Sequence, residues 1–467
     1  MGFWGQLRRH GMTGRGDAIV KDGPALDWAG LLARVEREAA ALQAAGLRAG
    51  MHVGITIPDE IEHFVASLAL LRLGAWQVAL ATHDTAAERE AIAARAGVSH
   101  VLLGPQGEPA AVGPGALSWP LPAGDVAAPA SDAGGVLLRT SGTTGTMNIV
   151  PLSGDALLVQ AARHPEYAGG RLLRPASIEH NNSKRHRLYC AAMGGTNVFL
   201  PAGQVDLADY CRRLGVTALD LALMQAADLQ GQPFDCEVRV SGSSVPHDLR
   251  QRLLATAAPK LVVRYGATEV GTIAVAGPAA HAGEGSVGRV VAGIELEIVD
   301  ADGWALPHGE SGQIRLRGEG IAAFYLDAPE QSAARFREGW FWPGDIGALA
   351  ADGTLRVLGR ADDMINLNGI NIFPSEIERV LESHPEIGAA AALGLPSPVH
   401  GQIPVAAVEL KPGRTALAQE LQAFARERLA LRAPRRILIV EALPRNSQGK
   451  IVRRELAAKF HILGSTR

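Results

Sequence analysis

The first hundred residues alternate between two hydrophobic patterns. Short apolar runs typical of strands flank a segment with helical spacing, at residues 51–57, 60–73 and 76–80. Thr85, followed three residues later by Glu88, forms a capping box that predicts the start of a helix, and a further strand-like run covers 98–103. Strands and helices in alternation predict a mainly parallel sheet covered by helices.

The alternation resumes in the middle of the chain, and the pattern then changes twice. Further strand-like runs occur at 136–139, 198–200, 216–221, 237–240 and 261–264. Residues 285–358 hold shorter segments separated by turn signals, which predicts a β-rich subdomain. After Arg360 a compact unit follows, with helices near 374–383 and 417–429 and strands near 389–393 and 405–410.

These patterns predict an α/β fold in two parts. We expect residues 1–360 to form a large N-terminal domain of parallel sheets with flanking helices plus the β-rich subdomain. We expect residues 361–467 to form a small, mobile C-terminal α+β domain. The stretch from Pro105 to Gly135 is rich in Gly, Pro and Ala and is more typical of a surface connection than of a domain border.

The composition of the chain excludes several classes of binding partner. The 467 residues include 45 Lys and Arg against 48 Asp and Glu, a net charge of −3, so we expect no nucleic-acid partner. Only six of the basic residues are lysines. The longest apolar window, 64–81, is broken by Arg72 and Gly74, so we expect no membrane insertion. The cysteines, three in number, are too widely spaced for a metal knuckle and fit a cytoplasmic protein. We expect a monomer or homodimer.

A Gly/Ser/Thr-rich loop follows the predicted strand 136–139. It comprises Thr140, Ser141, Gly142, Thr143, Thr144 and Gly145. Glycines let the backbone turn its N–H groups inward and the hydroxyls add donors, so the loop can wrap a polyphosphate. It lacks the Gly-Lys-Ser/Thr ending of the nucleotide P-loop. An ordinary turn is the alternative interpretation.

A second loop follows the strand 261–264. It reads Tyr265, Gly266, Ala267, Thr268 and Glu269. An aromatic face, a glycine that permits close approach and a carboxylate suit a purine with Mg²⁺ near its phosphates. A structural turn is the alternative.

Three further positions carry candidate chemistry nearer the C-terminus. Asp345 resembles the acidic residues that bind ribose hydroxyls in nucleotide sites, with a turn aspartate as the alternative. Residues 360–365 place two carboxylates beside Arg360, which is also typical of a solvated turn. Lys450 follows a glycine on a polar loop, where a cation can reach into a site from outside, although loop lysines are usually just exposed.

Taken together, these five ordered segments resemble the class I adenylate-forming (ANL) superfamily, which includes acyl-CoA and aryl-CoA synthetases and related AMP-binding ligases. The resemblance implies an acid–thiol ligase that uses ATP and Mg²⁺ to convert a small carboxylic acid to acyl-AMP and pyrophosphate. The acyl group then passes to a thiol, that of CoA or of the phosphopantetheine of an acyl carrier protein.

The resemblance also implies a role for each matching residue. Lys450 is the adenylation lysine, Thr268 and Glu269 serve the α-phosphate, and Glu269 also binds the metal. The loop from Thr140 to Gly145 holds the β- and γ-phosphates, the residues flanking adenine are Ser241, Gly242, Ser243, Tyr265, Gly266 and Ala267, and those binding ribose are Asp345 and Arg360. Asp362 is the hinge, Gly369 lines the thiol channel, and His180 contacts the acid.

One position departs from the family pattern. Asn148 stands where the phosphate loop normally continues with a lysine, so the expected cation is missing. The run 180–187 offers Lys184, Arg185 and Arg187 as substitutes that would face phosphate or an anionic substrate group. A solvated loop is the alternative interpretation of this run.

Two functional alternatives remain at this stage. The chain lacks the Phe-Asp-Xaa-Ser string of amino-acid-activating domains, which favours an acyl or aryl acid. The missing loop lysine motivates a second class, an adenylate-forming homologue that does not complete thioester formation, such as a pseudoenzyme, a sensor or a luciferase-like oxygenase.

Overall fold

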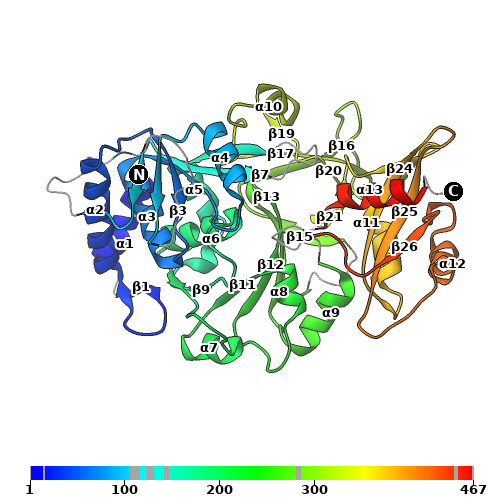
Figure 1. The fold of residues 1–467 in the computed structure, drawn as a ribbon, viewed down its shortest axis with the longest axis horizontal. Coiled ribbons are helices and arrows are strands. Elements are labelled where there is room, and N and C mark those ends of the chain that lie inside the picture. Colours follow the sequence, from blue (N-terminus) through cyan, green and yellow to red (C-terminus); the bar gives the residue numbers. More distant parts are fainter. Residues whose placement is uncertain are drawn as a thin grey trace.

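The computed structural model describes residues 2–13, 16–105, 115–122, 131, 133–140, 147–242, 245–279, 285–445 and 451–464, with side chains to Phe460. Within these residues the strands form three sheets. The N-terminal elements lie at one end of the long axis and the C-terminal elements at the other (Figure 1).

The first sheet has the order β6-β5-β3-β4-β7-β8. Its strands are β3 His52–Thr56, β4 Trp76–Ala79, β5 His100–Leu103, β6 Ala116–Ser118, β7 Gly135–Thr140 and β8 Asn148–Ser153. All neighbours are parallel except β7 and β8, which form an antiparallel pair. The helices inserted between its strands are α3 Glu60–Leu73 and α4 Ala86–Arg95.

Local signals explain where these two helices begin and end. Asp59 caps α3 by accepting hydrogen bonds from the first backbone N–H groups, and Gly74 ends it in the left-handed conformation. Thr85 and Glu88 form the expected capping box of α4. Helix α3 is buried from His63 to Leu73 because it is enclosed on all sides.

The second sheet is larger and mixed, with the order β18-β19-β17-β20-β21-β15-β14-β13-β12-β11-β9-β10-β1-β2, and β16 pairs with β17. Its first strands are β1 Asp17–Val20, β2 Leu26–Asp27, β9 Arg171–Leu173, β10 Thr196–Val198, β11 Ala218–Ala222, β12 Glu237–Ser241, β13 Leu261–Ala267 and β14 Gly271–Ala276. The later strands, which are antiparallel, are β15 Ser286–Val290, β16 Glu295–Val299, β17 Ser311–Arg317, β18 Phe336–Arg337, β19 Trp340–Phe341, β20 Asp345–Leu349 and β21 Thr354–Arg360.

Helices surround these two sheets. They are α1 Phe3–Thr13, α2 Trp28–Ala44, α5 Gly154–Ala162, α6 Asn181–Ala192, α7 Leu207–Arg213, α8 Leu223–Ala227, α9 His247–Thr256 and α10 Pro329–Arg335, with a 3-10 turn at Pro165–Tyr167. The main apolar core joins α1, α2, α3 and α6 to the first sheet. A separate core lies under α7, α8 and α9.

The C-terminal part, at right in Figure 1, has its own sheet and core. The strands are β22 Ile365–Leu367, β23 Ile370–Ile372, β24 Ile387–Ser397, β25 Gly401–Leu410 and β26 Ile437–Val440, and the helices are α11 Pro374–Glu382, α12 Ala418–Leu429 and α13 Arg453–Gly464, with a 3-10 turn at Ala430–Arg432. The α/β fold class expected from the hydrophobic pattern is confirmed. No helix in the described ranges is long and apolar enough to cross a membrane.

Candidate active site

Tyr265, Asp345 and Arg360 form a hydrogen-bonded chain where β13 approaches β20 and β21. The Tyr265 hydroxyl donates to Asp345 Oδ2, and Arg360 Nη1 donates to Asp345 Oδ1 at 3.2 Å. Asp345 and Arg360 are direct partners in the β20–β21 ladder, so strand register brings them together. Burial raises the pKa of the Asp345 carboxyl, and its hydrogen bonds with Arg360 and Tyr265 oppose that shift. Tyr265, predicted to flank adenine, and the two residues predicted to bind ribose therefore form one polar unit.

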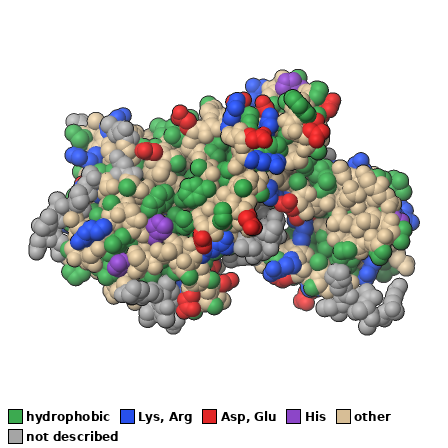
Figure 2. Space-filling model, turned by 90° about the horizontal axis from the view of Figure 1, so that it is seen from above, with side chains coloured by type: hydrophobic (Ala, Val, Ile, Leu, Met, Phe, Trp, Pro, Cys, Tyr) green, Lys and Arg blue, Asp and Glu red, His purple; other side chains and the backbone are tan. Residues whose placement is uncertain are grey.

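Asp362 continues this polar unit toward the C-terminal part. Its Oδ2 accepts hydrogen bonds from Arg335 Nη2 at 3.0 Å and from Arg360 Nη2 at 3.3 Å. Arg335 lies at the end of α10, so the predicted hinge carboxylate is held by arginines from two elements of the large part. Figure 2 shows acidic and basic side chains on both sides of the notch that separates the C-terminal part, at right, from the rest.

Thr268 and Glu269 are held by residues on both sides. The Thr268 carbonyl accepts from Arg185 Nη1 at 2.7 Å, and the Glu269 side chain, 7% exposed, accepts from the Tyr325 hydroxyl at 2.7 Å. The Ala322 N–H donates to the Glu269 carbonyl at 2.9 Å. Sequence reasoning missed Tyr325, because a single tyrosine in an irregular segment carries no pattern.

Helix α6 begins beside two other predicted site segments. Asn182 Nδ2 donates to Ser241 Oγ at 2.9 Å, and Asn181 Nδ2 donates to the carbonyl of Arg139, the residue before Thr140. The first turn of α6 therefore bridges the ends of β7 and β12. Sequence reasoning missed both asparagines, although their place next to His180 was a usable signal.

Asn148, the position without the expected lysine, lies directly opposite Thr140 in the β7–β8 ladder. Its Oδ1 is buried and has no hydrogen-bond partner among the described residues. A buried amide oxygen without a partner is unfavourable, so its environment suits a donor such as a water or a ligand group. The phosphate-loop residues that follow Thr140, from Ser141 to Gly145, lie outside the described residues, as do Ser243 and Lys450.

His180 precedes α6 and belongs to a polar group at the end of the first sheet. Its ring lies 4.8 Å from that of His83, and Glu179 Oε2 lies 3.6 Å from His83 Nδ1. Burial lowers the pKa of His180, with His83 and Arg139 adding to the shift. A neutral imidazole at this place can donate one hydrogen bond, through its N–H group, to a substrate oxygen.

The basic run that starts at His180 is not the solvated loop considered above. It forms helix α6, in which Lys184, Arg185 and Arg187 are 3%, 6% and 1% exposed. The loop interpretation was wrong because the residues that cover the helix are distant in sequence, so local polarity could not show its burial. Within the described part of the chain, Arg185 is the one of these three cations that reaches a predicted site segment, through the Thr268 carbonyl.

The other two cations of the run bind groups in the protein interior. Lys184 Nζ donates to Gln77 Oε1 at 3.3 Å, and burial lowers the pKa of Lys184 to about 7. The Arg187 guanidinium lies 3.9 Å from the centre of the Phe199 ring and donates to the Val198 carbonyl at 3.2 Å. These contacts commit both side chains to packing.

A charged network fills the other face of β13. Arg264 and Tyr265 are consecutive, so their side chains leave the strand on opposite faces. Asp220, 2% exposed, accepts from Arg174 Nη1 at 2.6 Å and from Arg264 Nη1 at 3.0 Å, and Arg239 is its neighbour in the β11–β12 ladder. Although burial opposes it, the three arginines lower the pKa of the Asp220 carboxyl. Sequence reasoning missed this network.

Two histidines, one of them on α6, complete the network. His186 Nδ1 lies 2.9 Å from the hydroxyl of Tyr167, and His164 stacks on the same tyrosine with ring centres 5.3 Å apart. Burial lowers the pKa of His164 to about 4, and burial with the nearby arginines lowers that of His186 well below its usual range. Both imidazoles are therefore neutral at neutral pH.

Two predicted glycines have structural reasons of their own. A Cβ on Gly266 would lie 2.2 Å from the Gly271 carbonyl oxygen, so the close β13–β14 pairing requires glycine there. Gly369 lies in the turn between β22 and β23 with φ of +83°, where an added Cβ would meet no atom within 4 Å. Its left-handed backbone alone favours glycine in this arrangement.

The residues present fit a magnesium–nucleotide complex. Mg²⁺ in such sites takes one or two carboxylates and completes its shell with phosphate oxygens and water. Glu269 Oε2 carries no hydrogen bond among the described residues and is available as that ligand. No cluster of three or more His, Cys, Asp or Glu side chains suited to a metal occurs in the described part of the chain.

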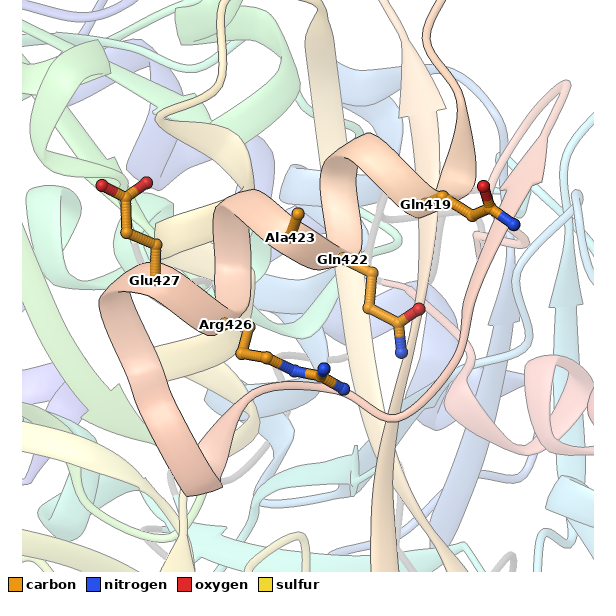
Figure 3. Close-up of a pocket in the computed structure, with 5 residues that line it drawn as sticks. All are labelled: Gln419, Gln422, Ala423, Arg426 and Glu427. Carbon is orange, nitrogen blue, oxygen red and sulfur yellow. The ribbon is translucent and has the colours of Figure 1, made fainter.

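Two cavities lie away from these residues. One, of about 390 Å³, runs along α12 (Figure 3) and is lined by Gln419, Gln422, Ala423, Arg426 and Glu427. The other, of about 720 Å³, lies where β12 and β13 begin, whereas Ser241 and Tyr265 lie toward the ends of the same strands.

Comparison with known proteins identifies the class. Residues 8–326 match the family model of the AMP-binding enzymes, and residues 376–450 match that of the AMP-binding enzyme C-terminal domain. The chain is an adenylate-forming enzyme. It belongs to the AMP-binding enzyme family, as the ordered segments predicted.

Full-length relatives are CoA ligases. The chain is 28% identical to feruloyl-CoA synthase from an Amycolatopsis species, covering 98% of this chain and 99% of that enzyme. It is 43% identical over 173 residues to 2-succinylbenzoate–CoA ligase from Geobacillus kaustophilus, a match that spans 37% of this chain and 35% of that one. The expectation of an AMP-forming acid–thiol ligase is confirmed at the level of enzyme class.

Solved structures agree with this placement. The o-succinylbenzoate CoA synthetase of Bacillus subtilis, in complex with its acyl-adenylate intermediate, superposes with a TM-score of 0.88 at 25% identity and covers 98% of each chain. The amide bond synthetase McbA from Marinactinospora thermotolerans gives a TM-score of 0.87 at 25% identity, covering 98% of this chain and 100% of that one.

Proposed function

We propose that this enzyme activates an acyl or aryl carboxylic acid with ATP, releasing pyrophosphate, and transfers the acyl group from acyl-AMP to the thiol of CoA. The observation that carries the proposal is the hydrogen-bonded chain Tyr265–Asp345–Arg360–Asp362, which links the predicted nucleotide residues to the predicted hinge. Feruloyl-CoA synthase and 2-succinylbenzoate–CoA ligase, its relatives, are named for aromatic acids and CoA.

The two parts of the chain have separate roles in this proposal. Residues 1–360 bind the nucleotide and the acid, and residues 361–467 form a lid that carries Lys450. Rotation about Asp362 exchanges the lid face between the two half-reactions, a change that a few residues can absorb. The separate C-terminal core supports movement of the lid as a body.

In the first half-reaction a carboxylate approaches the polyphosphate, so catalysis depends on positioning and on neutralising charge. Asp345 accepts hydrogen bonds from the ribose hydroxyls in place of the Tyr265 hydroxyl, while Arg360 keeps the carboxylate charged. Thr268 donates its hydroxyl to the α-phosphate, and Glu269 ligates Mg²⁺. When bound, Mg²⁺ neutralises phosphate charge during the displacement.

The acid lies beside His180 in this proposal, and Lys450 bridges its carboxylate and the nucleotide. The first turn of α6, which follows His180, contacts the ends of β7 and β12. In the second half-reaction the thiol displaces AMP. A phosphopantetheine arm on a carrier protein presents the same thiol, and the partial match to a fatty acid–acyl-carrier-protein ligase from Streptomyces coeruleorubidus makes it the second acceptor to test.

Asn148 supports one competing function, an adenylating homologue that does not complete thioester formation. The experiment is ATP–pyrophosphate exchange across a panel of aliphatic and aromatic acids, followed by mass detection of products with CoA, carrier protein or an amine. Exchange followed by CoA thioester supports the proposal. Exchange without any thioester supports the competitor, and no exchange with any acid contradicts both.

Two variants sharpen this experiment. Lys450→Ala is expected to lower acyl-AMP formation by about 10²–10³-fold while thioester formation from supplied acyl-AMP persists, since one positioned cation commonly contributes that much. Lys459→Ala, in α13, is the matched control. Asn148→Lys is expected to tighten ATP binding. Equal loss of both half-reactions in Lys450→Ala would refute the assigned role of Lys450.

A further inference from the structure

Two of the three cysteines lie together at one end of the larger sheet. Cys211 is on α7 and Cys236 immediately precedes β12. The Cys211 carbonyl accepts from the Val216 N–H at 2.8 Å, and two residues further Ala218 pairs with Glu237 in the β11–β12 ladder. The segment 216–218 therefore lies between Cys211 and the start of β12, next to Cys236.

Both thiols belong to the apolar core beneath α7, α8 and α9. Their mutual interaction raises the pKa of Cys211 and lowers that of Cys236, so Cys236 is the sulfur on which negative charge is favoured. Lys260 adds to the lowering at Cys236. Cys190 differs from both, because burial raises the pKa of its thiol to about 12.

Cys236, 6% exposed, is the member of the pair that lines a cavity. It lines the cavity of about 720 Å³ together with Thr217, Glu237 and Lys260. Lys260 is anchored at the cavity by donating to the Asp235 carbonyl at 2.8 Å. Cys211 lies in the core behind, 4% exposed, and is absent from the cavity lining. A small oxidant in the cavity thus meets Cys236 first, with Cys211 placed to react next.

We propose that Cys236 and Cys211 form a peroxide-sensitive dithiol. The Cys236 thiolate attacks a hydroperoxide, which breaks the O–O bond, forms the sulfenic acid at Cys236 and releases hydroxide or alkoxide. The Cys211 thiol then attacks the Cys236 sulfur, its proton leaves with the departing hydroxyl as water, and the S–S bond forms. Two thiols are oxidised and one peroxide is reduced.

The disulfide would join α7 to the start of β12 and leave the candidate active site largely untouched. Cys236 and Ser241 lie at opposite ends of the strand segment, roughly 16 Å apart at the rise of a strand. We expect the oxidised enzyme to unfold at a higher temperature, because a cross-link between distant residues restricts the unfolded chain. This site is independent of the acid-activating function.

The test uses the full chain treated with hydrogen peroxide, then denatured and alkylated. The expected result is a mass loss of about 2 Da before alkylation, then two fewer alkylated cysteines, and a peptide in which Cys211 is joined to Cys236. Cys211→Ser should instead accumulate a Cys236 sulfenic acid that a cyclic diketone probe captures. Cys236→Ser should show neither product, and Cys190→Ser, the matched control, should behave as the parent.

Retention of all three alkylatable thiols at a peroxide dose that oxidises a low-pKa reference thiol would overturn the proposal. A disulfide that includes Cys190 would also overturn it. Because the serine variants replace core thiols, their far-ultraviolet circular dichroism and melting are measured first. Unfolding of both variants leaves the parent mass and peptide map as the deciding measurement.

Discussion

Consecutive residues of β13 serve two polar regions that differ in what their charges can reach. On one face Tyr265 joins Asp345, Arg360 and Asp362, and the last two are 31% and 45% exposed at their side chains. On the other face Arg264 joins Asp220, whose side chain is 2% exposed. Both regions pair arginines with aspartates.

The two pairings contribute differently to stability and to binding. In the buried network every charge depends on its partner, because no water replaces a lost ion pair. At the candidate site Arg360 and Asp362 are partly exposed, so their pairing adds little stability and can be exchanged for contacts with a ligand. Removal of one partner should therefore damage folding on one face and binding on the other.

The largest effect is expected for Asp220→Asn. The change leaves three buried arginines without their shared carboxylate, so we expect unfolding to require about 3–5 kcal/mol less, or a failure to fold. Urea denaturation followed by tryptophan fluorescence measures it. Asp302→Asn on an exposed turn is the control. A loss below about 1 kcal/mol would show that the network is not held by charge.

The next effect concerns function on the opposite face. Asp345→Asn removes a charged acceptor and keeps the side-chain shape, so we expect kcat/KM for ATP to fall about 10–100-fold with a stability change below about 1 kcal/mol. Steady-state pyrophosphate release measures it. Asp352→Asn, an exposed position in the same β20–β21 hairpin, should leave kcat/KM unchanged. Equal effects of the two substitutions would contradict the ribose-binding role.

Lowering the pH should change folding stability in opposite directions through the two regions. His164 has a folded pKa of about 4 against an ordinary value of 6.5, so the unfolded chain binds protons first and stability falls as pH drops from about 6.5 to about 4. His186 and Asp220, with lowered pKa values, act in the same direction. The raised pKa of Asp345 acts oppositely, because that stability is lost as pH rises through the folded pKa.

Urea midpoints between pH 7 and pH 4.5 measure this dependence. We expect His164→Gln to reduce the loss of unfolding free energy between about pH 6.5 and pH 4 by up to about 3 kcal/mol, since one pKa unit corresponds to about 1.4 kcal/mol. His308→Gln, at an exposed turn, should leave the slope unchanged. A slope that persists in full without His164 would assign acid sensitivity to other groups.

The smallest effect is expected for Arg335→Ala at the hinge. Its pair with Asp362 is 27% and 45% exposed, so we expect a stability loss of about 0.2–1 kcal/mol that shrinks in high salt. Thermal unfolding at two salt concentrations measures it. A loss above about 2 kcal/mol would mean that the two regions are equally dependent on their charges.

Much of the fold followed from local patterns. Strand β3 and helix α3 lie where the alternation placed them, and the capping box at Thr85 begins α4. The β-rich segment after residue 285 is also confirmed. These features depend on neighbouring residues, so a single sequence reveals them. The run from His180 did not follow, because its burial depends on strands distant in the chain.

The sequence by itself determined the family and the fold class, because motifs in order and hydrophobic periods are local records of strands, loops and turns. It also exposed the missing cation at Asn148. The contacts of Tyr265 with Asp345, of Tyr325 with Glu269, and of Asp220 with three arginines arise from the three-dimensional fold. Strand register across a sheet makes those contacts, and register joins residues that no spacing along the chain connects.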